Sequence, residues 1–154
     1  MNETIDAARA AAILMETISS TFADMAFIDV EPAREGRALG EIDAPVRAAI
    51  DVLRPVSCRL EIRCPASLKA RIEATLFQGQ GEGRSEEDSL LEILNVAAGV
   101  FLTSYFGAGA DIKLELPQYL FSSEGSEGEV FASAEGDAEG EPLRAALTSI
   151  RYRY

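Results

Sequence analysis

The chain has 154 residues and a formal net charge of −12 at pH 7, and a chain of this length can bury roughly 70% of its unfolded surface in one domain. The acidic excess argues against nucleic acid and anionic membranes as partners, because both would repel it. With no histidine and two cysteines, it lacks the residues of a zinc site and the commonest general base. We therefore expect a single domain over 1–154 whose partner is a protein.

The N-terminal part is predicted to form a helix and a strand. Apolar residues recur at helical spacing from Thr4 to Thr21, and the pattern predicts a strand over Met25 to Glu31 and a loop over Pro32 to Glu41. The first eighteen residues carry three acidic residues and one arginine, which is unlike a secretory signal. We expect a cytoplasmic protein.

Two strand patterns, Val46 to Leu53 and Ser57 to Cys64, flank a short turn and predict a hairpin. Cys58 and Cys64 alternate with charged residues, so we expect two buried, reduced thiols rather than a disulfide or a reactive pair. A helix is predicted from Pro65 to Phe77. The glycine-punctuated loop that follows, Gln78 to Arg84, lacks the flanking strand and the lysine of a phosphate-binding loop.

The segment from Ser85 to Phe106 has the strongest helical pattern in the chain. Its apolar residues fall on one side, which must be buried, although the run from Ile93 to Ala110 is about as long as the shortest membrane span. Because that run is amphipathic, we interpret it as a buried domain helix. The opposite side carries a narrow strip that is polar or lacks a side chain: Asp88, Glu92, Asn95, Gly99 and Thr103.

Asn95 and Gly99 are poor choices for the middle of a helix, since together they cost roughly 1.5 kcal/mol relative to alanine. A structural interpretation is available: Asp88 completes a capping box with Ser85, Glu92 and Asn95 are solvated, and Gly99 lets another backbone pass close. We accept it for Asp88. For Glu92, Asn95 and Gly99 taken together, we favour a functional surface.

The C-terminal part is predicted to complete a sheet. A strand over Ile112 to Leu116 ends at Pro117, and Leu143 to Tyr154 forms a long final strand. Between them, Glu124 to Glu141 contains seven acidic residues and no basic one. We interpret this stretch as two solvated hairpin turns around a short strand from Glu129 to Ala134, in preference to an acidic docking site.

Together these elements predict an α+β fold in two layers, with two long helices side by side on one face of a largely antiparallel sheet. The other face of the sheet, with Arg59, Glu61 and Arg63, is expected to be exposed. Glu16 and Ser19 repeat the spacing of Glu92 and Asn95 in the first helix. We interpret that pair as structural, with a decayed second site as the alternative.

The series Asp88-x3-Glu92-x2-Asn95, followed by Pro117, resembles the signature of the CheX, CheC and FliY chemotaxis phosphatases. Twenty-one residues separate Asn95 from Pro117, where the family pattern has about twenty-two. The resemblance is strongest at this motif and closest to CheX-like proteins. It implies a CheC-like fold, hydrolysis of the aspartyl phosphate of a CheY-type response regulator, and a homodimer formed through sheet edges. The long C-terminal strand is expected to expose an edge, which fits such a homodimer.

The resemblance also implies roles for single residues. Glu92 would pair with a lysine of the regulator, and Asn95 suits the positioning of a water because its amide both accepts and donates hydrogen bonds. Asp88, Gly99, Thr103 and Pro117 are expected to contact the partner. The protein would have no cofactor of its own, since the regulator supplies Mg²⁺. The alternatives are a non-catalytic adaptor that uses the same helix face, and a small-molecule binding domain, for which the sequence shows no polar cluster around an apolar pocket.

Overall fold

The computed structural model describes residues 5–34, 45–77, 89–121 and 128–150. Within these residues, three helices accompany seven strands in one sheet, in which every pairing is antiparallel. The strand order is β1-β6-β7-β3-β2-β4, and β5 also pairs with β2. The elements are α1 (Ala7–Ala26), β1 (Val30–Pro32), β2 (Val46–Arg54), β3 (Cys58–Cys64), α2 (Ala66–Phe77), α3 (Ser89–Phe106), β4 (Lys113–Leu114), β5 (Gln118–Leu120), β6 (Val130–Ala138) and β7 (Glu141–Thr148).

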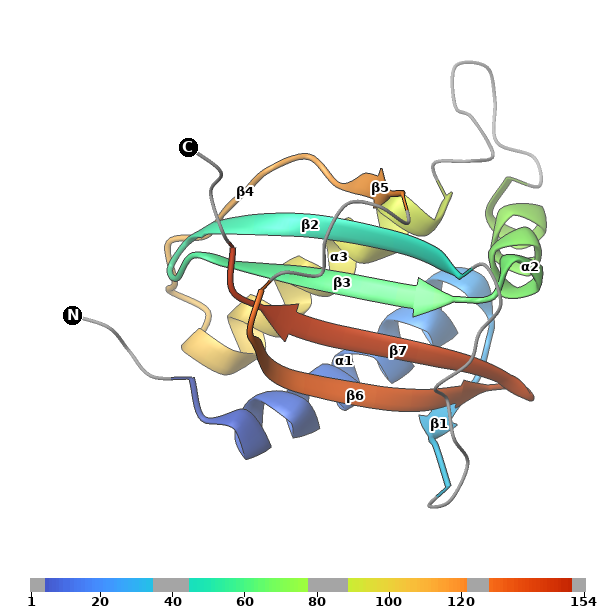
Figure 1. The fold of residues 1–154 in the computed structure, drawn as a ribbon, viewed down its shortest axis with the longest axis horizontal. Helices are drawn as coiled ribbons and strands as arrows, with labels where there is room; N and C mark the ends of the chain where they lie inside the picture. The colour runs from blue at the N-terminus through green and yellow to red at the C-terminus, as the bar shows by residue number, and fades with distance from the viewer. Residues whose placement is uncertain (1–4, 35–44, 78–88, 122–127, 151–154) are drawn as a thin grey trace.

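The helices cover one face of the sheet (Figure 1), which confirms the predicted α+β fold. In that view β2, β3, β7 and β6 cross the front, α1 and α3 lie behind them, and α2 stands at one end. The long helices α1 and α3 pack against each other. In addition, α1 packs against β6, and α3 packs against β2. The sheet and the helix pair therefore form the two layers that the sequence predicted.

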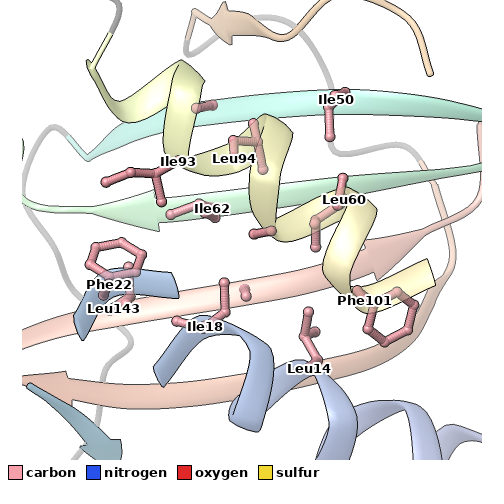
Figure 2. Close-up of a cluster of buried hydrophobic side chains, with 14 of the residues drawn as sticks. Leu14, Ile18, Phe22, Ile50, Leu60, Ile62, Ile93, Leu94, Phe101 and Leu143 are labelled. Carbon is pink, nitrogen blue, oxygen red and sulfur yellow. The ribbon is translucent and has the colours of Figure 1, made fainter. Parts of the chain in front are cut away.

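The core lies between these layers. Helical spacing turns one side of α1 and of α3 toward the sheet, and the alternation of the strands turns every second residue toward the helices. Burial of each large apolar side chain stabilises the fold by about 1.5–3 kcal/mol. The side chains labelled in Figure 2 are at most 2% exposed: Leu14, Ile18, Phe22, Ile50, Leu60, Ile62, Ile93, Leu94, Phe101 and Leu143.

The predicted hairpin is confirmed as β2 and β3, with residues in register from Val46 opposite Cys64 to Val52 opposite Cys58. Both cysteines are free and buried, as predicted. Burial, with a contribution from Asp51, raises the pKa of the Cys58 thiol to about 12. Burial also raises the pKa of Cys64 to about 12, with a further contribution from Glu141 and an opposing one from Lys69.

The N-terminal helix is longer than predicted. α1 continues beyond Thr21 to Ala26, because Phe22 and Ala26 extend the apolar spacing of the helix and are buried. It ends at Phe27, whose φ of 54° is left-handed and stops the helix. The strand predicted from Met25 is consequently reduced to β1, three residues that pair with the end of β6. Most of the predicted loop over Pro32 to Glu41, and all of that over Gln78 to Arg84, lie outside the described residues.

The C-terminal strands also differ from the prediction. The predicted strand over Ile112 to Leu116 forms β4 only at Lys113–Leu114. Glu129 to Ala134 was expected to be short, but β6 has nine residues and β7 begins at Glu141, after a tight turn in which Glu139 and Gly140 both have positive φ. Residues 149–150 are not in a strand, and 151–154 lie outside the described residues.

The position of β7 removes one argument for a homodimer. The long C-terminal strand was expected to expose an edge, but β7 pairs with β3 on one side and β6 on the other. It is an interior strand, so that premise is wrong. A homodimer stays an expectation that rests on the family resemblance.

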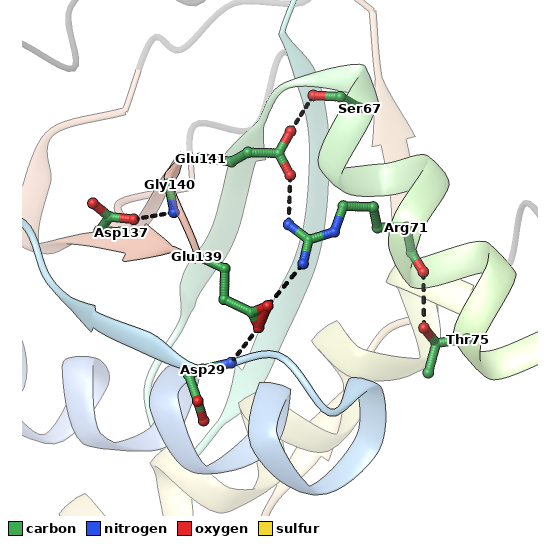
Figure 3. A network of polar contacts seen from close by, with 8 residues as sticks. All are labelled: Asp29, Ser67, Arg71, Thr75, Asp137, Glu139, Gly140 and Glu141. Carbon is green, nitrogen blue, oxygen red and sulfur yellow. Dashed lines mark hydrogen bonds and ion pairs between the residues drawn. The ribbon is translucent and has the colours of Figure 1, made fainter.

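The acidic turn between β6 and β7 is a structural contact (Figure 3), not only a solvated loop. Arg71 of α2 donates to Glu141 at 2.8 Å and to Glu139 at 3.0 Å, and Ser67 also donates to Glu141. Partial burial acts to raise the pKa of Glu141, but the hydrogen bonds from Ser67 and Arg71 outweigh it and hold the pKa below its usual value. Glu139 also accepts from the backbone N–H of Asp29 at 3.1 Å. The turn therefore joins α2 to the start of β1.

The sheet face opposite the helices is less exposed than predicted. Glu61 forms an ion pair with Arg47 at 2.6 Å, and their side chains are only 9% and 8% exposed. Arg59 is partly buried and pairs with Asp51 at 2.7 Å. The charged alternation in β3 therefore marks a face on which charges meet each other, and the prediction that Glu61 faces solvent is wrong.

Candidate functional site

The candidate site lies on α3, whose two sides differ sharply. One side fills the core through Leu90, Ile93, Leu94, Ala97, Ala98, Phe101 and Leu102. By length and composition α3 could cross a membrane, and it is the one such helix among the described residues, with 44% of its residues buried. Its apolar character comes mainly from the residues that face the core. This burial fits the interpretation of α3 as a helix of the domain interior.

The other side of α3 carries the predicted strip. Asn95 and Thr103 are exposed, and Glu92 and Gly99 are partly exposed. These four residues are three or four apart, so they stack along one side of the helix. Asp88 lies outside the described residues, as does the proposed capping box.

Two exposed apolar residues extend this surface. Val96 is 41% exposed and Val100 is 39% exposed, and each follows a strip residue directly in the sequence. The sequence analysis did not single them out, although their absence from the buried arc of the helix was a signal. We call Glu92, Asn95, Val96, Gly99, Val100 and Thr103 the α3 strip. It combines a carboxylate, an amide and a hydroxyl with two small apolar side chains.

Gly99 has free space in front of it. Among the described residues, a Cβ atom built at this position would have no neighbouring atom within 4 Å. No segment of the described chain passes close to Gly99, which contradicts the structural interpretation that it makes room for another backbone. Its backbone is helical, so no special conformation requires glycine here. Within the protein, Gly99 carries a cost in helix stability without a packing reason.

Pro117 lies between β4 and β5, which both pair with β2. It is partly exposed, and its neighbour Leu116 is 87% exposed. Since α3 packs against β2, the helical part of the motif and Pro117 both adjoin this strand. The structure thus places Pro117 at the sheet edge nearest α3, and not on the helix surface itself.

The Glu16 and Ser19 pair in α1, which repeats the spacing of Glu92 and Asn95, has a different environment. The hydroxyl of Ser19 donates to the backbone carbonyl of Val30 at 2.8 Å, which ties α1 to β1. Glu16 is exposed. Ser19 is thus committed to a contact within the fold, which favours the structural interpretation of this pair. Among the described residues, no group of three or more Cys, Asp or Glu side chains could hold a metal ion.

Comparisons by sequence found no protein-family model and no curated protein that matches the chain. Solved structures do match its fold. CheX from Desulfovibrio desulfuricans superposes with a TM-score of 0.69 at 11% identity, over 90% of this chain and 97% of that protein. For CheX from Vibrio vulnificus the TM-score is 0.67 at 15% identity, over 91% and 98% of the two chains.

A third match comes from the CheX-CheY-BeF3-Mg²⁺ complex of Borrelia burgdorferi, with a TM-score of 0.59 at 16% identity, over 89% of this chain and 95% of that one. CheC-like and FliY structures match as well. The chain therefore has the fold of the CheX, CheC and FliY proteins, as its motif predicted.

Proposed function

We propose that this protein is a phosphatase that removes the aspartyl phosphate from a CheY-type response regulator in chemotaxis or a related two-component pathway. The observation that carries the proposal is the α3 strip, in which Asn95 is exposed and Glu92 and Gly99 lie one turn to either side. The CheX-type fold supports it, since a CheX of this fold was crystallised with CheY. On the resemblance alone, we also infer a cytoplasmic location and a homodimer.

In this mechanism the regulator brings most of the reaction centre. A receiver domain holds its own aspartyl phosphate, Mg²⁺ and a lysine, so the acyl phosphate is already activated. It lacks a water held in line with the leaving carboxylate. The Asn95 carbonyl can accept a hydrogen bond from such a water while its amide N–H donates toward a phosphoryl oxygen. A carboxylate or a lysine could not do both.

Glu92 has a different role in the proposal. As a general base next to Asn95 it would bring negative charge against the phosphoryl group, which opposes the reaction. Pairing with the regulator's lysine avoids this repulsion and orients the two proteins. Gly99, Thr103 and Pro117 would shape the contact surface, as would Asp88, and Val96 and Val100 add apolar area beside Asn95.

Single-turnover dephosphorylation with excess protein tests the mechanism, after a panel of phosphorylated receiver domains has been screened for phosphate release. Asn95→Ala should leave the complex intact and slow hydrolysis by about two orders of magnitude, the usual effect of losing one positioned group. Glu92→Ala should weaken binding and hydrolysis together. Ser104→Ala, at an exposed position of the same helix outside the α3 strip, is the matched control and should change neither.

The alternative of a non-catalytic adaptor is an outcome of the same experiment. An adaptor would bind the phosphorylated regulator through the α3 strip and would tolerate the loss of Asn95. If the Asn95→Ala variant hydrolysed the true partner at the wild-type rate, the phosphatase mechanism would be wrong and the adaptor would replace it.

A further inference from the structure

A second candidate site lies on the sheet face opposite the helices, away from α3. A cavity of about 200 Å³ opens there over β3, β7 and the start of β6. Its lining includes two arginines, one glutamate and one threonine, together with the backbone at the start of β6: Glu61, Arg63, Arg144, Thr148, Gly128 and Val130. Neither the motif nor the proposed phosphatase function uses these residues.

The charges around this cavity are unbalanced. Arg63 and Arg144 are directly opposite each other in the register of β3 and β7, an arrangement in which like charges destabilise a sheet. The one carboxylate among the lining residues is that of Glu61, whose Oε1 accepts from Arg47 at 2.6 Å and from Arg63 at 3.4 Å. The cavity lining thus carries two guanidinium groups and one carboxylate, an excess of one positive charge in a chain whose own net charge is −12.

The side chain of Arg144 gives the clearest indication that the cavity binds a ligand. Its Nε is buried and has no hydrogen-bond partner. Glu135 is its register partner in β6 but is exposed, and no ion pair joins the two side chains. A buried guanidinium donor without an acceptor is costly, and buried charges are normally paired. Arg144 therefore presents a donor to the cavity that nothing in the described part of the chain satisfies.

We propose that this cavity binds a phosphate group, either as inorganic phosphate or as the headgroup of a small phosphate monoester. A phosphate carries about −1.5 to −2 charges at pH 7 and can therefore pair with both guanidinium groups of the lining. Guanidinium forks bind such oxyanions bidentately. The Thr148 hydroxyl, on the same sheet face, can donate a further hydrogen bond. The cavity is smaller than the pockets that hold drug-sized ligands, so only a compact molecule fits.

Isothermal titration of the 154-residue protein with inorganic phosphate, and with glycerol phosphate, tests the site at constant ionic strength. Both probes should bind the wild type, and the tighter one identifies the source of the phosphate group. Arg144→Gln and Arg63→Gln should each weaken binding at least tenfold. Arg59→Gln is the matched control, because Arg59 is on the same face but pairs with Asp51 and does not line the cavity; it should change binding less than twofold.

A stability readout separates a ligand site from a structural role. Without phosphate, Arg144→Gln should unfold at the same or a higher temperature than the wild type, since it removes a charge that lacks a partner and lies opposite Arg63. Phosphate should raise the unfolding temperature of the wild type but not of this variant.

Several results would overturn the assignment: sodium chloride having the same effect as phosphate, acetate binding tighter than either phosphate probe, or Arg144→Gln destabilising the protein while it binds phosphate normally. A change of oligomeric state in Arg144→Gln, without wild-type phosphate binding, would instead assign this face to a contact between copies. The site does not depend on the proposed phosphatase function, so Asn95→Ala should bind phosphate like the wild type.

Discussion

Substitution of Gly99 should make the protein more stable and less able to bind its partner. Glycine in a helix interior costs about 0.8–1.0 kcal/mol relative to alanine, and leucine ranks close behind alanine. No clash with the described part of the chain offsets this gain, because a Cβ at Gly99 would have no neighbour there within 4 Å. Gly99→Ala should therefore raise the free energy of unfolding by nearly that amount, and raise the Tm by about 2–4 °C for a domain of this size.

A side chain at position 99 should weaken binding of the regulator, although it stabilises the fold. In the proposed complex the regulator approaches the helix at Gly99, so a side chain there would hold the two surfaces apart. Gly99→Leu should fold and be at least as stable as the wild type, yet lose measurable binding to a phosphorylated receiver domain. Ser104→Leu, which adds the same side chain to an exposed position outside the α3 strip, should leave binding unchanged.

Urea unfolding measures the first effect, and titration of a receiver domain held in its phosphorylated state measures the second. If Gly99→Ala were less stable than the wild type, the account of Gly99 as a residue without a packing role would fail. If Gly99→Leu bound the regulator normally, the steric argument for the α3 strip would fail, whatever the stability result.

Two further predictions concern the fold. Because the pKa of Glu141 is lowered in the folded state, its ionised form stabilises the protein at neutral pH, and this contribution is lost as the pH falls below about 4.3 and through the folded-state value. Glu141→Gln should thus cost about 0.5–1 kcal/mol at neutral pH, with allowance for the partial exposure of Arg71, and less in acid. Urea unfolding with Glu135→Gln as the control measures this, and an equal cost at both pH values would contradict it. Cys58 and Cys64, buried with pKa values of about 12, should react with a thiol reagent at least about a hundredfold more slowly in the native protein than in urea; rapid labelling without unfolding would show that the core opens locally.

The layers, the hairpin and the two sides of α3 were predictable, because each follows from the spacing of apolar residues within a short stretch of sequence. Apolar residues three and four apart fix the buried side of a helix, and alternation fixes the buried side of a strand such as β3. Asn95 and Gly99 were visible for the converse reason, since both break the local preference of the helix that contains them.

The rest depends on partners distant in sequence. The pattern in Met25 to Glu31 is apolar enough for a strand, and only the packing of Phe22 and Ala26 decides that the helix continues. The alternation of Arg59, Glu61 and Arg63 indicates a solvent face, but the burial of Glu61 depends on Arg47 of the adjacent strand. The pairing of Arg144 with Arg63 follows from the order of the strands in the sheet, and no local sequence pattern predicts that order.

The topology has a consequence for the order in which the chain can fold. α1, the first of the described helices in chain order, packs on β6, and β1 pairs with the last three residues of that strand. Closing loops that span most of the chain is slow, because their entropy is lost before the contacts form. During synthesis α1 could pack on α3 first, but the part of its apolar side that β6 covers would stay open until that strand had emerged. The hairpin of β2 and β3, whose partners are adjacent in sequence, can form long before that.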